Sequence, residues 1–185
     1  ITNLLALFIL LVAMSKMDTQ TVDMVRQSIK RATTKPFGET NQADKKFAAA
    51  VTELIRKHDL KNVANLQNTV DGISLTFSGG FFFETLSADL TPEAQKILDT
   101  LAPFFKDLPP EMRIDVGGHS DTLRITDDSL FPSNWELSAS RAASVVRFLA
   151  SRDVPTNKLR AIGYADTQPI SKVLDQNRRV VIRVG

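Results

Sequence analysis

The chain contains no cysteine, and this absence excludes a group of functions. Without thiols there is no disulfide, no thiolate nucleophile and no cysteine-ligated zinc. Histidine is scarce as well, since His58 and His119 are the only two. Two histidines are too few for a zinc site, so we expect neither a metal nor a cofactor.

Neither sign of charge predominates. The 23 basic and 21 acidic residues leave a formal net charge of +2, and the two signs are spread evenly along the chain. A protein that binds nucleic acid gathers Lys and Arg on one surface, so we exclude nucleic acid as a partner. The 185 residues suffice for one globular domain and an appendage, because domains commonly contain about 100–150 residues.

The chain also lacks an apolar run that could cross a bilayer, which takes about 20 residues. Residues 4–14 are eleven apolar residues in a row, and polarity returns at Ser15 and Lys16. Because the sequence begins at Ile1 rather than at methionine, we interpret residues 1–18 as the outer part of a transmembrane helix truncated on its N-terminal side. A signal-peptide remnant and a buried core helix are the alternatives.

Residues 19–43 predict a plug or linker segment rather than part of a core. Val22, Val25 and Ile29 follow a helical spacing, which favours a weakly amphipathic helix. Pro36 and Gly38 then stand among polar residues, a composition typical of a linker. The globular domain is therefore expected over residues 44–185.

Within that domain, helical and strand patterns alternate. Apolar periodicity predicts helices at 44–60, 90–105 and 137–152, and strands at 112–119, 159–164 and 178–184. A hairpin is expected at 63–77, because Asp71-Gly72 is a typical turn pair. This order predicts an α/β fold, in the form of an α+β sandwich whose helices pack on a mixed sheet.

A binding cleft is expected where the strand at 112–119 ends. Asp121 follows that strand, and Asn134, Ser138 and Arg141 would share one face of the next helix if it begins near residue 133. Asp121 would accept from an ammonium, and Arg141 would hold a carboxylate by two parallel hydrogen bonds. The pattern predicts a site for a small zwitterion; a plain salt bridge between Asp121 and Arg141 is the alternative.

Four blocks resemble the OmpA-like peptidoglycan-binding domain: "GHSD", "NWELSASRAASVVRFL", "AIGYADTQP" and "NRRVVIRV". The resemblance extends over residues 66–184. It implies that Asp121 and Arg141 bind the diaminopimelate of the peptidoglycan stem peptide. Ala165 departs from the family pattern, which often has glycine at this position.

The same resemblance implies four further site residues. Asn134 and Leu137 match positions that flank the family's pocket, Ser120 replaces its usual threonine and keeps the hydroxyl, and Glu84 matches an acid near the rim. A helix cap is the plain alternative for Asn134, and a solvated acid for Glu84. Arg178 and Arg179 are expected to line the last strand in a structural role.

The segments "DTLRITDDSLFPSNWELS" and "ITNLLALFILLVAMSKMD" are similar to flagellar-motor stator B subunits of the MotB and PomB type. This similarity implies a non-enzymatic, single-pass inner-membrane protein with a periplasmic C-terminal domain that anchors an ion-driven motor to peptidoglycan. It also implies a homodimer, a multi-span channel partner of the MotA or PomA type, and an ion-carrying aspartate upstream of Ile1.

Two other functions remain open at this stage. One is a general peptidoglycan-associated envelope anchor, or a related defence or secretion component, without an ion path. The other is a serine hydrolase built on His119, Ser120 and Asp121, which is disfavoured because neighbours on a strand point to opposite faces. We expect His119 to be a hydrogen-bonded strand residue and Trp135 to pack against the inserted loop.

Overall fold

The computed structural model describes residues 42–57, 59–69, 72–125 and 130–185. Proximity of Cα atoms divides the chain into two units, residues 1–39 and 40–185. The predicted membrane segment 1–18 and nearly all of the predicted plug and linker at 19–43 lie outside the described residues. None of the helices that are described is long and apolar enough to cross a membrane.

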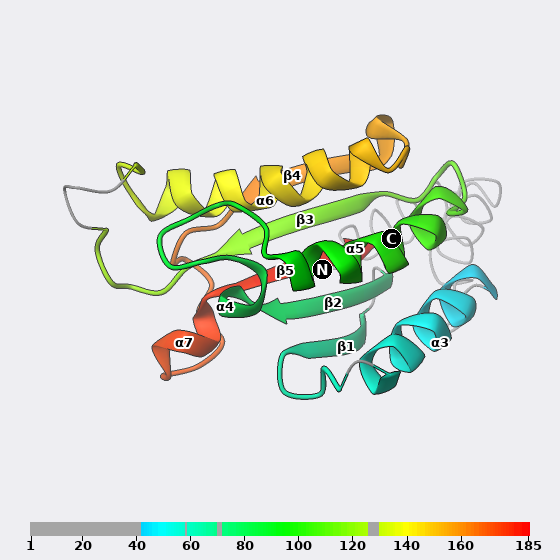
Figure 1. Ribbon diagram of the computed structural model, residues 1–185, viewed down its shortest axis with the longest axis horizontal. Coiled ribbons are helices and arrows are strands. Elements are labelled where there is room, and N and C mark those ends of the chain that lie inside the picture. The colour runs from blue at the N-terminus through cyan, green and yellow to red at the C-terminus, as the bar shows by residue number, and fades with distance from the viewer. Residues whose placement is uncertain (1–41, 58, 70–71, 126–129) are drawn as a thin grey trace, which may run out of the picture. The chain divides into compact units, whose positions relative to one another are not determined.

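The second unit is built on a five-stranded mixed sheet (Figure 1). Its strands lie in the order β1-β2-β5-β3-β4, and only the β3–β4 pair is parallel. The elements are α3 Gln42–Lys57, β1 Ala64–Thr69, β2 Gly72–Ser78, α4 Gly79–Phe82, α5 Pro92–Lys106, β3 Ile114–His119, α6 Asn134–Ser151, a 3-10 turn Thr156–Lys158, β4 Leu159–Gly163, α7 Leu174–Asn177 and β5 Arg179–Val184. This arrangement confirms the predicted fold class.

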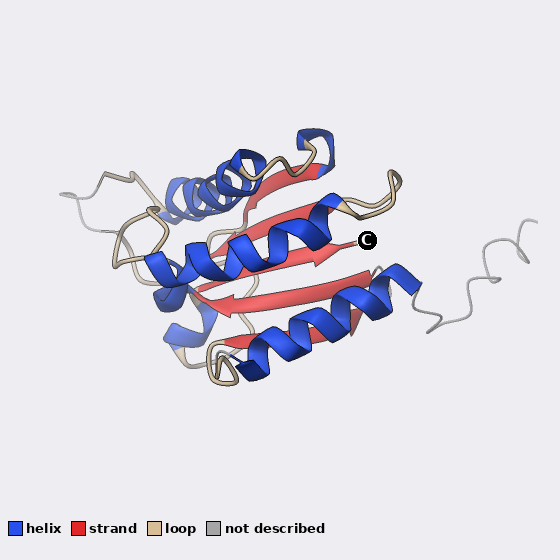
Figure 2. Cartoon of the chain, turned by 45° about the vertical axis from the view of Figure 1, so that its right-hand side comes forward, coloured by secondary structure: helices blue, strands red, loops and turns tan. Residues whose placement is uncertain are grey.

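The long helices α3, α5 and α6 form one layer in front of the sheet (Figure 2). The predicted stripe of α5 is buried, including Ile97, Leu101 and Phe105. It meets strand residues that point to the same side, and these are almost completely buried: Ile73, Leu75, Phe77, Ile114, Val116, Val180, Ile182 and Val184. Because each such side chain contributes about 1.5–3 kcal/mol when removed from water, this layer contact is the main source of stability.

The β1–β2 hairpin lies where it was predicted, but Gly72 is the first residue of β2 rather than part of the turn. Thr69 pairs with Gly72 at its closed end, and Ala64 pairs with Phe77 at the other. Gly72 has φ +130, and a Cβ there would lie 2.0 Å from the carbonyl oxygen of Val184. Glycine is required at this position, both for the backbone conformation and for the close approach of β5.

Helix α6 begins at Asn134, which is the earlier of the two starts that the sequence permits. The Ser133 hydroxyl accepts a hydrogen bond from the Trp135 amide at 3.1 Å and donates to the Glu136 carboxylate. That hydroxyl lowers the pKa of Glu136 below its ordinary value. Ser133 is therefore the N-cap of α6, and its side-chain contacts place the first turn of the helix.

Glycine in β3 brings α6 close to the sheet. A Cβ on Gly118 would lie 2.1 Å from the Ser138 carbonyl oxygen, so the helix rests directly on the strand. Ser138 is buried here, and its hydroxyl accepts a hydrogen bond from the Ala165 amide at 3.0 Å. Close packing of α6 on β3 sets the end of the strand beside the beginning of the helix.

Candidate functional site

A cavity of about 450 Å³ opens where β3 ends and α6 begins. All six of the predicted site residues line it: Glu84, Ser120, Asp121, Asn134, Leu137 and Arg141. Ser138 does not, because it faces the sheet and the loop at Ala165 rather than the cavity. The structure thus places the residues of the predicted cleft on one side of the fold, although three separate segments supply them.

Asp121 stands two residues beyond the end of β3 and is only 5% exposed. Its Oδ1 accepts a hydrogen bond from the Leu123 amide at 2.9 Å, and its Oδ2 accepts one from Nη1 of Arg178 at 2.5 Å. The carboxylate is therefore held at both oxygens. Its ion pair is with Arg178, so the plain salt bridge with Arg141 is wrong as an alternative.

Asn134 fastens this loop to the start of α6. Its Nδ2 donates to the carbonyl oxygens of Asp121, at 3.0 Å, and Leu123, at 2.9 Å. The helix cap is Ser133, so the capping role considered for Asn134 is wrong. The side-chain amide instead holds the segment from Asp121 to Leu123 in place beside the cavity.

Arg141 reaches the cavity from the second turn of α6 and is 6% exposed. Its Nε donates to the Ser87 carbonyl oxygen at 2.8 Å and its Nη2 to that of Glu84 at 3.2 Å, while the guanidinium lies over the Phe83 ring. Burial lowers the pKa of Arg141 to about 10, with repulsion from Arg178 as the next cause. The side chain stays charged at neutral pH.

Arg141 keeps hydrogen-bond donors that could serve a ligand. Two of its five N–H groups are occupied by the carbonyls of the 84–87 loop, and Nη1 has no hydrogen-bond partner within the described part of the chain. No described carboxylate lies within salt-bridge distance of this guanidinium either. A buried cation of this kind is stabilised by an anion that enters the cavity, since desolvation of an unpaired charge is costly.

The other three predicted residues occupy different parts of the cavity. Leu137 is buried in its wall. Ser120 is also buried, and its amide donates a hydrogen bond to the Ala165 carbonyl oxygen at 2.8 Å. The Glu84 side chain is exposed, as the solvated-acid alternative expected, while its backbone carbonyl orients Arg141. Leu86, on the same loop, adopts φ 54 and also lines the cavity.

Arg178 is the site residue that sequence reasoning missed. It was expected to line the last strand, but it stands just before β5, lines the cavity and pairs with Asp121. The antiparallel β3–β5 register, which sets His119 opposite Arg179, brings it there. Arg179 does have a structural role, because it is buried and donates to the carbonyl oxygens of Asn177 and Gln168.

The geometry does not support a hydrolase triad. His119 is 1% exposed, and neither of its ring nitrogens has a hydrogen-bond partner in the described structure, so the expected hydrogen-bonded histidine is wrong. Its ring stacks on Tyr164 with centroids 4.7 Å apart, and the Ser120 hydroxyl donates to the Asp121 carbonyl oxygen instead. Trp135 is 51% exposed, and its packing against the inserted loop stays a prediction, because residues 126–129 of that loop lie outside the described ranges.

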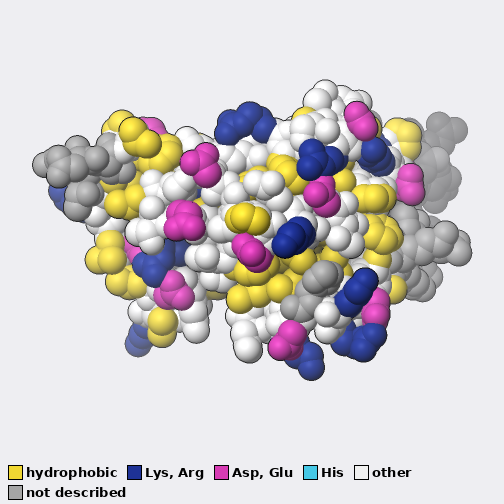
Figure 3. Space-filling view, in the orientation of Figure 1, with side chains coloured by type: hydrophobic (Ala, Val, Ile, Leu, Met, Phe, Trp, Pro, Cys, Tyr) yellow, Lys and Arg dark blue, Asp and Glu magenta, His cyan; other side chains and the backbone are white. Residues whose placement is uncertain are grey.

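The surface around the site mixes all classes of side chain. At the end of the molecule where α7 lies, acidic, basic and hydrophobic side chains are interspersed (Figure 3). Within the described ranges, no group of three or more His, Asp or Glu residues is arranged to hold a metal ion. The buried charged side chains that line the cavity are Asp121 and Arg141, and Arg178 pairs with Asp121 at its rim.

Two protein-family models match the chain. Residues 82–183 match the OmpA family, and residues 1–33 match the family described as membrane MotB of the proton-channel complex MotA/MotB. The first match contains the whole cavity except for its α4 edge. The second falls on residues outside the described structure.

Individual relatives agree with both matches. The uncharacterized protein YtxE of Bacillus subtilis is 30% identical over 98% of this chain and 83% of its own length. Motility protein B of Escherichia coli is 38% identical over 48% of this chain and 29% of its length. A peptidoglycan-associated lipoprotein of Rhizobium meliloti is 34% identical over 56% of this chain and 58% of its length. The chain thus spans much less than two thirds of motility protein B.

A solved structure shows the same fold. The periplasmic domain of Helicobacter pylori MotB superposes with a TM-score of 0.61 at 26% identity, over 65% of this chain and 87% of that one. The share of this chain that superposes is consistent with a match to the globular unit.

Proposed function

Because this chain belongs to the OmpA family and has a MotB-type N-terminal segment, we propose that it is a non-enzymatic subunit that fastens a membrane complex to peptidoglycan. The observation that carries this proposal is that one cavity contains both a buried carboxylate and a buried guanidinium, which are not paired with each other. Arg141 is a buried guanidinium with no carboxylate partner among the described residues, and Asp121 lies across the same cavity. A ligand with an ammonium and a carboxylate satisfies both.

The ligand that fits is the diaminopimelate of the stem peptide. Its ammonium donates to Asp121, and its carboxylate accepts from Nη1 and the second N–H of Nη2 on Arg141. The Ser87 and Glu84 carbonyls hold the guanidinium in one orientation, so little side-chain entropy is lost on binding. Lysine could not present two parallel donors at this position.

A sedimentation assay with purified sacculi tests the proposal. Arg141→Ala and Asp121→Ala are each expected to weaken retention by about 30-fold or more, because each leaves a ligand charge unpaired in a desolvated site. Arg147→Ala, on the same helix, and Asp115→Ala, on the strand before Asp121, are the matched controls and should bind like the parent.

Free diaminopimelate should compete with sacculi for the parent protein. Equal retention of the parent and of both site variants would exclude this cavity as the binding site. Circular dichroism of each variant identifies loss of binding that follows merely from unfolding.

For the complex that is anchored, we propose a flagellar-motor stator of the MotB and PomB type. The MotB match at residues 1–33 and the likeness to motility protein B support this choice. In this proposal residues 1–18 belong to a single inner-membrane span, residues 19–43 form the plug and linker, and residues 44–185 lie in the periplasm. The subunit forms a homodimer and assembles with a multi-span channel partner of the MotA or PomA type.

A general peptidoglycan-associated anchor is the second candidate, favoured by the 34% identity to the lipoprotein. Swimming through soft agar separates the two. The full-length protein with its channel partner should restore motility to a strain without stators if it is a stator subunit. A lack of motility together with normal retention on sacculi would favour the general anchor. Light scattering of the purified protein tests the dimer.

A further inference from the structure

We propose that Arg178 is a latch on the binding cleft, which a ligand's ammonium displaces from Asp121 and which Asp175 then retains. The inference rests on the proposed function and concerns how that site exchanges its charges. It assigns a positioning role to Arg178 and Asp175. Neither residue binds the ammonium or the carboxylate of the ligand in the proposed complex.

The first observation is that Arg178 covers Asp121. The Asp121 carboxylate is almost buried, and its Oδ2 accepts from Nη1 of Arg178 at 2.5 Å. The Arg178 side chain is 40% exposed, whereas that of Asp121 is 6% exposed. The guanidinium thus lies between the carboxylate and solvent. An ammonium that comes from the cavity and bonds to Oδ2 shares this oxygen with Arg178 or replaces it.

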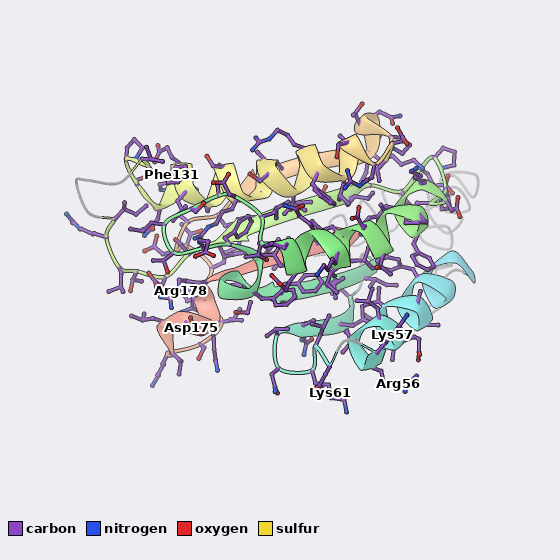
Figure 4. All side chains as sticks on the ribbon, in the orientation of Figure 1. Arg56, Lys57, Lys61, Phe131, Asp175 and Arg178 are labelled. Carbon is purple, nitrogen blue, oxygen red and sulfur yellow. The ribbon has the colours of Figure 1, made fainter. Side chains whose placement is uncertain are left out.

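The second observation is that Arg178 has a second acidic partner. Its Nη2 donates to Oδ1 of Asp175 at 2.5 Å, and the two labelled side chains lie close together at α7 (Figure 4). Both bonds raise the pKa of Arg178, that to Asp121 more than that to Asp175. The Asp175 side chain is 67% exposed, so this carboxylate is hydrated and able to keep the guanidinium at the rim.

These contacts allow the ligand's ammonium to replace Arg178 on Asp121 without leaving any of the three charges unpaired. Removing one partner from a buried ion pair is strongly unfavourable, because the remaining charge is desolvated and unpaired. Here the ammonium takes over Asp121 as Arg178 leaves, and Arg178 remains paired with Asp175 in water. The same pairing keeps Asp121 neutralised before the ligand arrives.

A rival role for Arg178 makes the opposite prediction. The charge of Arg178 lowers the pKa of Arg141, so the two cations act on the same region and could both bind the ligand's carboxylate. In that case Asp175 competes with the ligand for Arg178. Removing the charge of Asp175 would then strengthen binding, and removing Arg178 would weaken it.

Calorimetric titration with free diaminopimelate distinguishes the two roles. The latch predicts that Asp175→Asn binds about two- to fivefold more weakly, because Asp175 shares Arg178 with Asp121 before the ligand binds and is its sole acidic partner afterwards. Arg178→Gln is expected to bind about threefold or more tightly, because the ammonium no longer has a competitor. In the double variant the effect of Asp175→Asn should disappear.

Asp153→Asn is the matched control, because it removes an exposed ion pair with Lys106 that does not line the cavity. Unchanged or tighter binding by Asp175→Asn would overturn the latch. That outcome is decisive even if Arg178→Gln fails to fold, since Asp175 is at the surface. Failure of the parent itself to bind sacculi would refute the proposed function instead.

Discussion

His119 should make the protein less stable in mild acid, and replacing it should remove that loss. The imidazole is buried beneath Tyr164, close to the charges of Arg179 and Arg183. Burial, together with the charges of the two arginines, lowers the pKa of His119 from 6.5 to about 3. The unfolded chain therefore binds a proton at this residue across a pH range in which the folded protein does not.

The sign and size of the effect follow from linkage. Because the unfolded state holds more protons, the free energy of unfolding is highest above pH 6.5 and falls as pH decreases toward about 3. The slope approaches 1.36 kcal/mol per pH unit. Between about pH 7.5 and pH 4.5, the folded state should lose roughly 2.7 kcal/mol through this residue alone.

His119→Phe is the perturbation that isolates this term. Phenylalanine keeps a ring against Tyr164, and the two nitrogens that it removes have no hydrogen-bond partners among the described residues. At pH 7.5 the variant should match the parent to within about 1.5 kcal/mol, as expected for a similar volume. At pH 4.5 it should have gained about 2.7 kcal/mol relative to the parent.

Urea unfolding followed by circular dichroism, at pH values from about 7.5 to 4.5, measures the difference directly. Carboxylates that titrate in this range are common to both proteins, so their effect cancels in the difference. A difference that does not change with pH would refute the reasoning. It would mean that His119 is protonated equally in both states, or that it finds a partner on folding.

Three further variants test the packing that positions the site, each by urea unfolding. Gly118→Ala should destabilise the fold by about 3 kcal/mol, because its Cβ would meet the Ser138 carbonyl, whereas Gly80→Ala has open space and should be nearly neutral. Ser138→Ala should cost about 1–3 kcal/mol, since it leaves the Ala165 amide without its acceptor. Ser133→Ala should cost about 1 kcal/mol through loss of the α6 cap; an unchanged midpoint would contradict that role.

Several parts of the fold were predictable from local patterns. The buried stripe of α5 follows from a period of 3.6 residues, and its start follows from Thr91, whose hydroxyl accepts from the Ala94 amide at 3.1 Å. The positive φ of Ala165 explains why glycine is common at that position in the family pattern. Signals of this kind are encoded within a few residues of the chain.

The exact start of α6 and the partners of buried side chains were harder to predict from the sequence. Asn134 lines the pocket as expected, but it does not cap the helix and instead binds two carbonyl oxygens of the segment that follows β3. His119 was expected to be hydrogen-bonded, yet it is stacked. A residue's type states which bonds it can form, but its neighbours in space decide which bonds it does form.

By itself, the sequence determined the alternation of elements, the hairpin turn and the identity of the acid and guanidinium in the cleft, because period, turn chemistry and residue type are local properties. Only the tertiary structure decided that Asp121 pairs with Arg178 and that Arg141 is held by backbone carbonyls. Those contacts join residues more than 50 positions apart. They depend on the antiparallel pairing of β3 with β5 and on the close contact of α6 with Gly118, which packing of the whole core selects.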